Sequence, residues 1–310
     1  MSQQTLAGRI TRSQSGFFTV STEQGDFVCR LRGRLKRGPK TGDIAAVGDE
    51  VRISLQGNQT GMIESVEPRE SGLIRLAPTP RGMYQQVLVA NPDQIVLVFA
   101  CANPTPKRRL LDRFLVVCEK QHIPVLIVAN KVDLVGSRAA EDIFSLYADI
   151  GYEVIYTSAE SGLGVSALKD RLVGRLSCLA GPSGVGKSSL LNAIQPELGL
   201  RVREVSSLTT KGRHTTVVRE MFPLDEGGYV VDLPGLRMLA MWDMEPEELD
   251  GYFPELSPLV RNCQFSDCTH LHEPGCAVRE AVEKGQVHEA RYQSYLRMRY
   301  GDDLEEFPET

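Results

Sequence analysis

The segment that decides the fold is residues 176–189, which read LSCLAGPSGVGKSS. Its first five residues, Leu176–Ala180, are mostly apolar and predict a buried strand, and a helix is expected to begin near Lys187. The glycine-rich turn between them matches the phosphate-loop pattern G-x-x-x-x-G-K-[ST], and it stands between a strand and a helix as that pattern requires. The segment therefore predicts a nucleotide phosphate site in an α/β domain.

The residue types of this loop suit the binding of phosphate. Glycines let backbone N–H groups converge on phosphate oxygens, and the N-terminus of the following helix adds a favourable dipole. Lys187 is expected to neutralise the β- and γ-phosphates during catalysis, and Ser188 to coordinate Mg²⁺. The loop residues predicted to bind nucleotide are Gly181, Pro182, Ser183, Gly184, Val185, Gly186, Lys187, Ser188 and Ser189.

The sequence on both sides of the loop alternates short apolar runs with helical stretches, the pattern of a mainly parallel sheet covered by helices. Strands are predicted at 86–90, 94–100, 125–129, 153–156, 176–180 and 229–231. Helices are predicted at 108–121, 139–150, 165–172 and 187–194. We therefore expect an α/β domain over residues 71–243.

A second motif follows the strand predicted at 125–129 and reads N-K-V-D. It stands at the carboxyl end of its strand, where an open α/β sheet places its ligands. In the GTPases that this tetrapeptide resembles, the aspartate accepts two hydrogen bonds from guanine, a donor pair that adenine lacks. The motif Thr157-Ser158-Ala159 after the strand at 153–156 adds a loop of the type that contacts the guanine carbonyl through backbone N–H groups. The residues predicted to bind the base are Asn130, Lys131, Val132, Asp133, Ser158 and Ala159.

Two further segments predict a magnesium site. Asp232 and Gly235 belong to D-L-P-G after the strand at 229–231, which matches the D-x-x-G element. In that element the aspartate reaches Mg²⁺ through water and the glycine N–H senses the γ-phosphate. The polar segment before it carries K-G-R-H-T-T at 211–216, a candidate switch whose threonine would complete the Mg²⁺ shell. The predicted magnesium ligands are Ser188, Thr215 and Asp232, with Thr216 as the alternative to Thr215.

One position bears on the rate of hydrolysis. Leu236 follows Gly235, where Ras-like enzymes keep the glutamine that orients the attacking water, and leucine cannot orient water. We therefore expect slow intrinsic hydrolysis and a second group that assists it. His214 in the candidate switch is the choice for that group, and an exposed loop histidine is the other interpretation. The predicted catalytic residues are His214, Thr215 and Lys187.

The order of these motifs is rotated. A Ras-like GTPase presents the phosphate loop first, followed by the switch threonine, D-x-x-G, N-K-x-D and Ser-Ala. Here N-K-V-D and Ser-Ala precede the phosphate loop, although the cyclic order is the same. Joining the termini of a domain and cutting it elsewhere keeps the same sheet, because domain termini often lie close together. The sequence therefore predicts a circularly permuted domain.

Three of the seven cysteines cluster in the pattern Cys263-x₄-Cys268-x-His270-x₅-Cys276. Three thiolates and one imidazole are the donors of a closed, structural zinc site, which leaves no open position for catalysis. His272 is an alternative to His270. We therefore expect a mostly α zinc-binding domain over residues 244–310, with a helix at about 287–300.

Residues 1–70 predict a small β-barrel that binds RNA. Five short strands at 6–12, 17–21, 27–31, 50–55 and 62–66 are separated by turn signals. This pattern fits an OB-fold, which binds oligonucleotides, although SH3-like barrels produce the same pattern.

Charge gives a second indication of nucleic-acid binding. The formal net charge is −5, but residues 30–40 hold six basic side chains and no acidic one. Such a patch can neutralise RNA phosphates in an otherwise acidic protein. The residues predicted to bind RNA are Arg30, Arg32, Arg34, Lys36 and Arg37. A second candidate surface on the last helix comprises Arg291, Arg297 and Arg299 with Tyr292 and Tyr295, although tyrosines at this spacing more often pack inward.

Together these features resemble one family over nearly the whole chain, the circularly permuted GTPases of the RsgA type. The resemblance rests on the succession of barrel, N-K-V-D, phosphate loop, G-R-H-T-T, D-x-x-G and cysteine cluster. It implies GTP and GDP as substrate and product, with Mg²⁺ and one structural Zn²⁺. It also implies that the small ribosomal subunit is the partner, that this subunit stimulates hydrolysis late in its own maturation, and that the barrel and zinc region contact its rRNA. In that family the histidine at the position of His214 assists hydrolysis.

Two other functions remain open. One is GTP-dependent regulation of a non-ribosomal partner, and the other is an RNA-binding module that binds nucleotide without significant hydrolysis. The longest apolar runs are too short to cross a bilayer, and the N-terminus lacks the apolar core of a signal peptide. We therefore expect a cytoplasmic protein without membrane contact, and take a monomer as its state.

Overall fold

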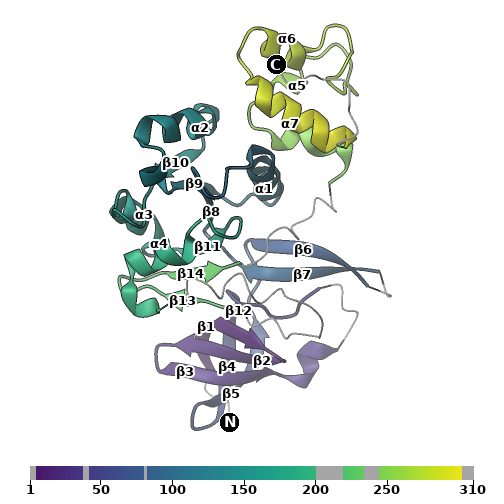
Figure 1. Cartoon of the computed structure of the whole chain (residues 1–310). Helices are drawn as coiled ribbons and strands as arrows, with labels where there is room; N and C mark the ends of the chain where they lie inside the picture. Colours follow the sequence, from purple (N-terminus) through teal and green to yellow (C-terminus); the bar gives the residue numbers. More distant parts are fainter. Residues whose placement is uncertain (1–4, 38–41, 80–81, 200–218, 234–243, 302–310) are drawn as a thin grey trace.

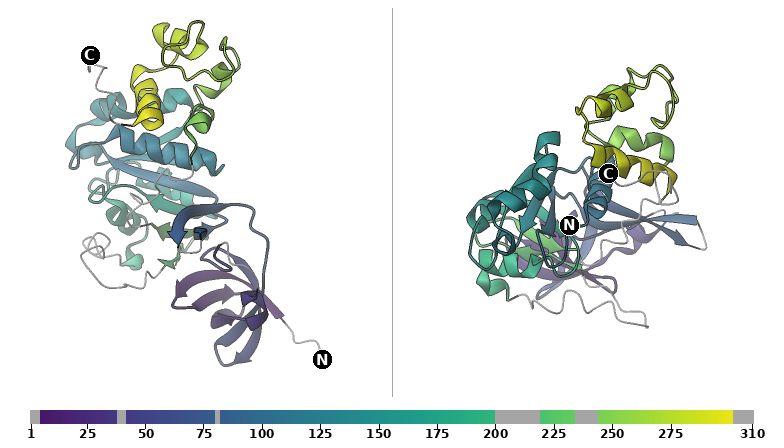
Figure 2. Two further views of the ribbon diagram at one scale, coloured as in Figure 1. Left: turned by 90° about the vertical axis from the view of Figure 1, so that its right-hand side faces the viewer. Right: turned by 45° about the horizontal axis from the view of Figure 1, so that its top comes forward.

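The computed structural model describes residues 5–37, 42–79, 82–199, 219–233 and 244–301. An N-terminal barrel and a helical C-terminal part lie at opposite ends of an elongated molecule, with an α/β domain between them (Figures 1 and 2). This succession agrees with the fold class expected from the sequence.

The barrel is a closed five-stranded sheet. Its strands are β1 (Thr5–Gln14), β2 (Phe17–Thr22), β3 (Gly25–Leu31), β4 (Glu50–Gly57) and β5 (Thr60–Val66). The strand order is β1-β2-β3-β5-β4, and β1 also pairs with β4, which closes the sheet. β3 and β5 run parallel, whereas the other pairs are antiparallel. This connectivity is that of an OB-like barrel, and it separates the two barrel types that the sequence pattern left open.

A long antiparallel hairpin of β6 (Gly72–Thr79) and β7 (Gly82–Ala90) projects beside the α/β domain (Figure 1). The prediction that residues 86–90 belong to the parallel sheet is therefore wrong. Burial alternates along β7, where Val87 and Val89 face inward, whereas all seven residues of the neighbouring strand β8 (Gln94–Ala100) are buried. A strand within a covered parallel sheet is buried on both faces, and β7 is not.

The α/β domain has a six-stranded sheet in the order β10-β9-β8-β11-β14-β13. Besides β8, its strands are β9 (Val125–Asn130), β10 (Glu153–Tyr156), β11 (Leu176–Ala180), β13 (Phe222–Pro223) and β14 (Tyr229–Asp232). All are parallel except β13 at the edge. Helices α1 (Arg108–Lys120) and α2 (Ser137–Ile150) share one core with the sheet, and α3 (Val165–Leu172) and α4 (Lys187–Ile194) share the core of the other face. The sheet is therefore covered on both sides, as its apolar strands require.

The C-terminal part is mostly helical, as expected. It consists of a 3-10 segment η5 (Pro246–Tyr252) and the helices α5 (Ser257–Val260), α6 (Ala277–Glu283) and α7 (Glu289–Tyr300). Its own core includes Phe253, Leu256 and Tyr295. No helix in the described ranges has the length and apolar character needed to span a bilayer.

Candidate functional site

The order in which successive strands are added to the sheet reverses between β8 and β11. From β8 it moves outward to β9 and β10, and it then returns to β11 on the other side of β8 before it continues to β14. Ligands of open α/β sheets bind beyond the carboxyl ends of the strands at such a reversal. The phosphate loop, N-K-V-D and Asp232 all follow the carboxyl ends of these strands, so motifs that lie far apart in sequence meet at one edge.

The phosphate loop depends on glycine at two close approaches. Gly181 has φ of 145°, and a Cβ there would lie 2.0 Å from the Val98 carbonyl oxygen. Gly186 has φ of 97°, and a Cβ there would lie 2.4 Å from the side-chain nitrogen of Asn130. Any other residue would push the loop off β8 or off the N-K-V-D segment.

Lys187 begins α4 and folds back over the loop. Its Nζ donates hydrogen bonds to the carbonyl oxygens of Gly181 at 2.9 Å and Pro182 at 3.0 Å. Burial lowers the pKa of this ammonium, and the charge of Asp232 opposes that effect in part. The next residue, Ser188, is also buried. The loop therefore holds a partly desolvated positive charge that a phosphate would stabilise.

Asp232 is the last residue of β14, which pairs with β11 on the side away from β8. Its Oδ1 is buried and has no hydrogen-bond partner within the described residues. Burial raises the pKa of the carboxyl group, and the charge of Lys187 opposes that effect in part. A buried carboxylate oxygen without a partner fits a position beside a hydrated cation, so the residues present suit Mg²⁺.

One side chain joins the predicted base-binding loop to the phosphate loop. Asn130 is 1% exposed, and its Nδ2 donates to the Val185 carbonyl oxygen at 2.8 Å. Its Oδ1 accepts a hydrogen bond from the Thr157 hydroxyl at 3.0 Å. Thr157, which follows β10 as Asn130 ends β9, was missing from the predicted site residues. Its place at a strand end beside Ser158 was the available signal.

Lys131 makes a second connection. It has a left-handed backbone with φ of 64°, and its Nζ donates to the Gly184 carbonyl oxygen at 2.7 Å and to that of Asn103. Asn103 lies in the loop after β8, and no sequence pattern indicated it. Two consecutive residues of N-K-V-D thus hold the phosphate loop from the side of β9.

Asp133 is exposed at the rim of this edge, in contrast to its buried neighbour Val132. Its charge contributes to raising the pKa of Cys101 to about 11, although burial is the larger cause. Ser158 is buried, and its Oγ accepts a hydrogen bond from the Ser161 N–H at 3.1 Å, while Ala159 is half-buried. The Asp133 carboxylate is therefore open to solvent, whereas Ser158 is held within its own loop.

Several predicted positions lie outside the described residues: Gly235, Leu236, His214, Thr215 and Thr216. Their roles stay predictions.

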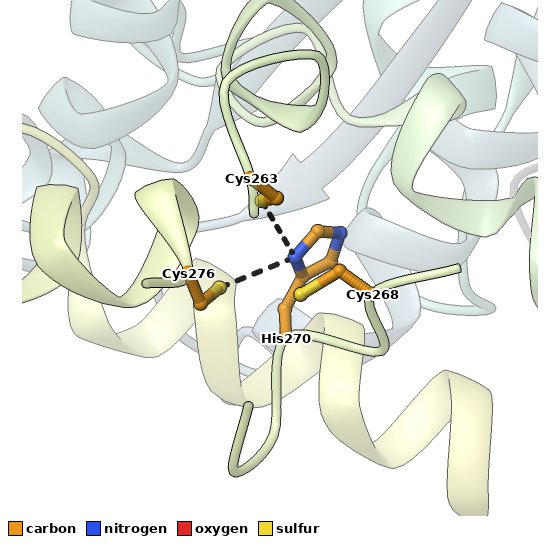
Figure 3. Close-up of side chains that lie close together, drawn as sticks. All are labelled: Cys263, Cys268, His270 and Cys276. Carbon is orange, nitrogen blue, oxygen red and sulfur yellow. Dashed lines mark hydrogen bonds between the residues drawn. The ribbon is translucent and has the colours of Figure 1, made fainter. Parts of the chain in front are cut away.

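Cys263, Cys268, His270 and Cys276 form a compact cluster, with all four candidate ligand atoms within 4.8 Å of one another (Figure 3). The His270 Nδ1 lies 3.6 Å from the Cys263 Sγ and 3.4 Å from the Cys276 Sγ. Burial raises the pKa of the thiols of Cys268 and Cys276, so a cation is needed to hold them as thiolates. Three sulfurs and one nitrogen in a closed set suit Zn²⁺.

The orientation of His270 has a clear structural cause. Its Nε2 lies 3.0 Å from the Asp250 Oδ2, and its carbonyl oxygen accepts a hydrogen bond from the Tyr292 hydroxyl at 2.6 Å. A carboxylate on the distal nitrogen of a ligating histidine fixes the ring and leaves Nδ1 for metal. His272, the alternative ligand, is exposed and lies outside the cluster. Sequence reasoning missed Asp250, since it stands twenty residues before His270 in no recognisable pattern.

The five predicted RNA-binding residues do not form one surface of unpaired charge. Arg32 and Arg34 both form ion pairs with Glu64 of β5, and the Ser54 hydroxyl donates to the same carboxylate. Arg30 instead lies on the outer face of the barrel, with its guanidinium 4.2 Å from the centre of the Phe17 ring. Lys36 and Arg37 are exposed at the end of the following 3-10 turn.

The second candidate RNA surface, on α7, is contradicted for three of its members. Arg291 is 1% exposed and donates to Asp112 of α1 and to Glu255, while Tyr292 and Tyr295 are buried in the C-terminal core. A fully buried guanidinium cannot meet RNA. The periodicity of α7 did not distinguish a buried ion pair from a basic face.

Comparisons with known proteins fit this geometry. A sequence model of the RsgA N-terminal domain matches residues 7–63, and one of the RsgA GTPase matches residues 66–242. A protein of Gemmatimonas aurantiaca named small ribosomal subunit biogenesis GTPase RsgA is 45% identical over 296 residues, covering 94% of this chain and 96% of the relative. A protein of that name from Caldanaerobacter subterraneus is 41% identical over 293 residues, or 94% of each chain.

Two solved structures are similar along nearly the whole chain. The crystal structure of YjeQ from Thermotoga maritima has a TM-score of 0.78 and 37% identity, covering 96% of this chain and 98% of that one. YloQ, described as a circularly permuted GTPase, has a TM-score of 0.71 and 32% identity, covering 96% and 94%. The rotated motifs meet at one sheet edge, and both the sequence models and the relatives extend over the barrel and the α/β domain, so this chain belongs to the RsgA GTPase family.

Proposed function

We propose that this protein hydrolyses GTP during biogenesis of the small ribosomal subunit, and that the subunit stimulates hydrolysis. The observation that carries the proposal is the convergence of Lys187, Asn130 and Asp232 at one sheet edge, in a chain whose relatives are named for this activity. Among the described residues, the buried Oδ1 of Asp232 has no hydrogen-bond partner. Acting with ribosomal subunits would place the protein in the cytoplasm, and we propose that it acts there as a monomer.

Within the site, we propose that the backbone of residues 181–186 and Lys187 hold the β- and γ-phosphates. Ser188 and Asp232, with Thr215 or Thr216, would hold Mg²⁺, and Gly235 would sense the γ-phosphate. Bound Mg²⁺ would neutralise charge that develops on the transferred phosphoryl group. Because Lys187 is already buried against its own loop, phosphate binding replaces its carbonyl contacts with little rearrangement.

For the base, we propose that Asp133 accepts the two guanine donors while Asn130 and Lys131 hold the loop in place. The Asp133→Asn variant should bind GDP weakly and shift its preference towards xanthine nucleotides, because an amide presents the complementary donor to the xanthine carbonyl. Competition binding with GDP and XDP measures this shift. An unaltered preference would remove Asp133 from the base site.

The test of the whole function is GTP turnover measured alone, with purified small subunits and with large subunits. We expect a slow basal rate and an increase with small subunits. The absence of that increase would favour a regulator of a non-ribosomal partner, and the absence of hydrolysis under every condition would favour an RNA module that binds nucleotide. His214→Ala under stimulated conditions tests the assisting histidine, and an unchanged rate would exclude it.

We also propose that the division into residues 1–70, 71–243 and 244–310 separates an RNA-binding barrel, the GTPase domain and a domain with one structural Zn²⁺. Both terminal parts would contact rRNA. In the barrel, Phe17 is partly exposed and the Arg30 guanidinium lies over its ring, and an aromatic side chain with a stacked guanidinium suits an unpaired base. Arg32 and Arg34 are less available, because Glu64 already neutralises part of their charge.

A further inference from the structure

The short segment 219–223 connects the barrel to the GTPase sheet. Its first half, β12 (Arg219–Glu220), pairs with β1 of the barrel, and its second half, β13, pairs with β14 of the GTPase domain. The two residues before Met221 and the two after it thus belong to two different sheets. In the described ranges, β12 adds a sixth strand to the edge of the barrel, and that strand belongs by sequence to the nucleotide-binding domain.

The joint with the barrel is made by backbone and side-chain contacts. Arg12 lies opposite Glu220 and Ser13 opposite Arg219, and the Met221 N–H donates to the Thr11 carbonyl oxygen at 2.8 Å. The guanidinium of Arg12 lies 3.7 Å from the Glu220 carboxylate. Met221 is 3% exposed in the core that the barrel shares with the GTPase domain. The segment is therefore held by backbone pairing with β1 and by the burial of Met221 in the shared core.

The other end of the segment leads to the nucleotide site. Phe222 lies opposite Val230 and Pro223 opposite Tyr229, and β14 ends two residues after Val230 at Asp232. Upstream in the sequence, the candidate switch at 211–216 ends three residues before Arg219. The barrel edge is thus bonded to the chain between two elements expected to respond to the γ-phosphate.

The first half of β1 is fixed within the barrel itself. Residues 5–9 pair with β4, and the Ile10 N–H and carbonyl group bond to Asp49 and Gly48. Residues 11–13 are the part of β1 whose outer edge takes β12. A displacement of β12 would therefore act on residues 11–13, which follow the part of β1 that is bonded to β4.

We propose that β1 of the barrel is a positioning element of the GTPase site, and that the joint of residues 11–13 with 219–221 couples barrel occupancy to nucleotide state. The proposal rests on the proposed GTP-dependent function. Because coupling between two sites is reciprocal, a partner that binds the barrel differently in two joint geometries must shift nucleotide affinity by the same factor. Residues 219–232 join the two sheets without a break, since β12 pairs with β1 and Phe222 pairs with Val230, two residues before Asp232.

Hydrogen exchange of the full-length protein tests the joint without any ribosome. The Met221 amide, which bonds to Thr11, should exchange at rates that differ several-fold between the GDP-bound form and a form with a non-hydrolysable GTP analogue. Amides of β5, which lies away from the joint, are the internal reference. Nucleotide binding is measured in the same samples. If neither nucleotide binds, the proposed function fails and this inference with it, whereas equal Met221 rates in two bound states overturn this inference alone.

Variants test whether the joint couples the barrel to GTP hydrolysis. Glu220→Arg places like charges opposite each other at the joint and adds, rather than removes, a basic side chain for RNA. It should lower stimulation by small subunits roughly two- to fivefold, and Arg12→Glu combined with Glu220→Arg should restore it. Arg9 of β1 and Glu50 of β4 form a matched pair within the barrel, where they lie opposite each other and their side chains are 2.8 Å apart.

Glu50→Arg is therefore the control, and it should leave stimulation within twofold of the unmodified protein. Equal loss in Glu50→Arg and Glu220→Arg would show a general effect on the barrel and overturn the proposal. Full stimulation in Glu220→Arg would overturn it as well.

Discussion

The two ends of the molecule are attached to the GTPase domain in different ways. The barrel is attached through a strand, since β12 continues its sheet with an exposed ion pair at the edge. The C-terminal part is attached through side chains, because Arg291 of α7 reaches the buried Asp112 of α1. One joint consists of backbone bonds to the segment before β14, and the other of buried charge on a core helix.

The charged joint is built as a closed network. Arg291 donates to Asp112 at 2.6 Å and to Glu255 at 2.7 Å, and Asp112 also accepts hydrogen bonds from Tyr147 and Ser294. Burial by itself lowers the pKa of Arg291, but the bonds and charges of Glu255 and Asp112 raise it overall. Such a network tolerates little displacement, because every group that moves leaves a buried polar partner unsatisfied.

The contrast assigns different mechanical properties to the two ends. An exposed ion pair at a strand edge can rearrange at small cost, whereas breaking a buried ion network leaves uncompensated charge in the core. We therefore expect the C-terminal part to move with α1 as one body, and the barrel to shift with nucleotide state.

The largest expected effect is that of metal removal. Because metal-binding free energy is folding free energy in small zinc domains, chelation should unfold residues 244–301 while the barrel stays folded. Metal analysis should give about one zinc per chain, and hydrogen exchange should locate the loss of protection. His270→Ala should reproduce the effect of chelation.

His272→Ala is the matched control, because this exposed histidine stands two residues away and outside the cluster. It should keep its zinc and its protection. A zinc content near zero in protein purified without chelator would refute the assignment.

The next effect is that of breaking the charged joint. Arg291→Met leaves Asp112 and Glu255 buried without their cation and should cost about 3–5 kcal/mol in the free energy of unfolding. Urea denaturation followed by circular dichroism measures this loss. Lys284→Met removes an exposed ion pair with Glu280 in the same part of the chain and should leave the free energy of unfolding almost unchanged. Equal losses in the two variants would contradict the distinction between a buried and an exposed pair.

The smallest effect concerns the barrel and depends on pH. The pKa of Glu64 is lowered first by the hydrogen bond from Ser54 and then by Arg32, while burial opposes both. A carboxyl group whose pKa is lower in the folded state stabilises the protein above its unfolded pKa, and the contribution is lost as pH falls through the folded value. Glu64→Gln should therefore cost about 1–2 kcal/mol at neutral pH, and this difference should shrink below the unperturbed carboxyl pKa of about 4.5.

Denaturation at neutral and acidic pH checks this, with Glu67→Gln as the control, because Glu67 forms an exposed pair with Arg52. A loss from Glu64→Gln that persists undiminished in acid would contradict the electrostatic cause.

The sequence predicted those parts of the site whose geometry is local. The phosphate loop needs glycines, lysine and serine at fixed spacing, and the structure places them as that spacing requires. The cysteine cluster is similarly local, and His270 could be named, although its choice over His272 depends on Asp250.

Features of the site that depend on contacts between residues distant in sequence could not be predicted from the sequence. Asn103 joins the site through a hydrogen bond from Lys131, and no sequence pattern surrounds it. Thr157 stands beside the predicted Ser158, but its hydrogen bond to Asn130 depends on how β9 and β10 pair. Arg32 pairs with Glu64 of the neighbouring strand β5, which is distant in sequence, so the positive charge of the basic run is partly neutralised. Periodicity likewise placed residues 86–90 in the wrong sheet, since an apolar run does not specify its pairing partner.

The strand joint also has a consequence for the order in which the chain folds on the ribosome that makes it. The barrel strands β1 to β5 emerge first, but β12 leaves the ribosome about two hundred residues after β1. Throughout that interval the outer edge of residues 11–13 has no native strand beside it. An open strand edge is a template for pairing with other chains. The nascent barrel is therefore open to aggregation at this edge until β12 of the GTPase domain pairs with it.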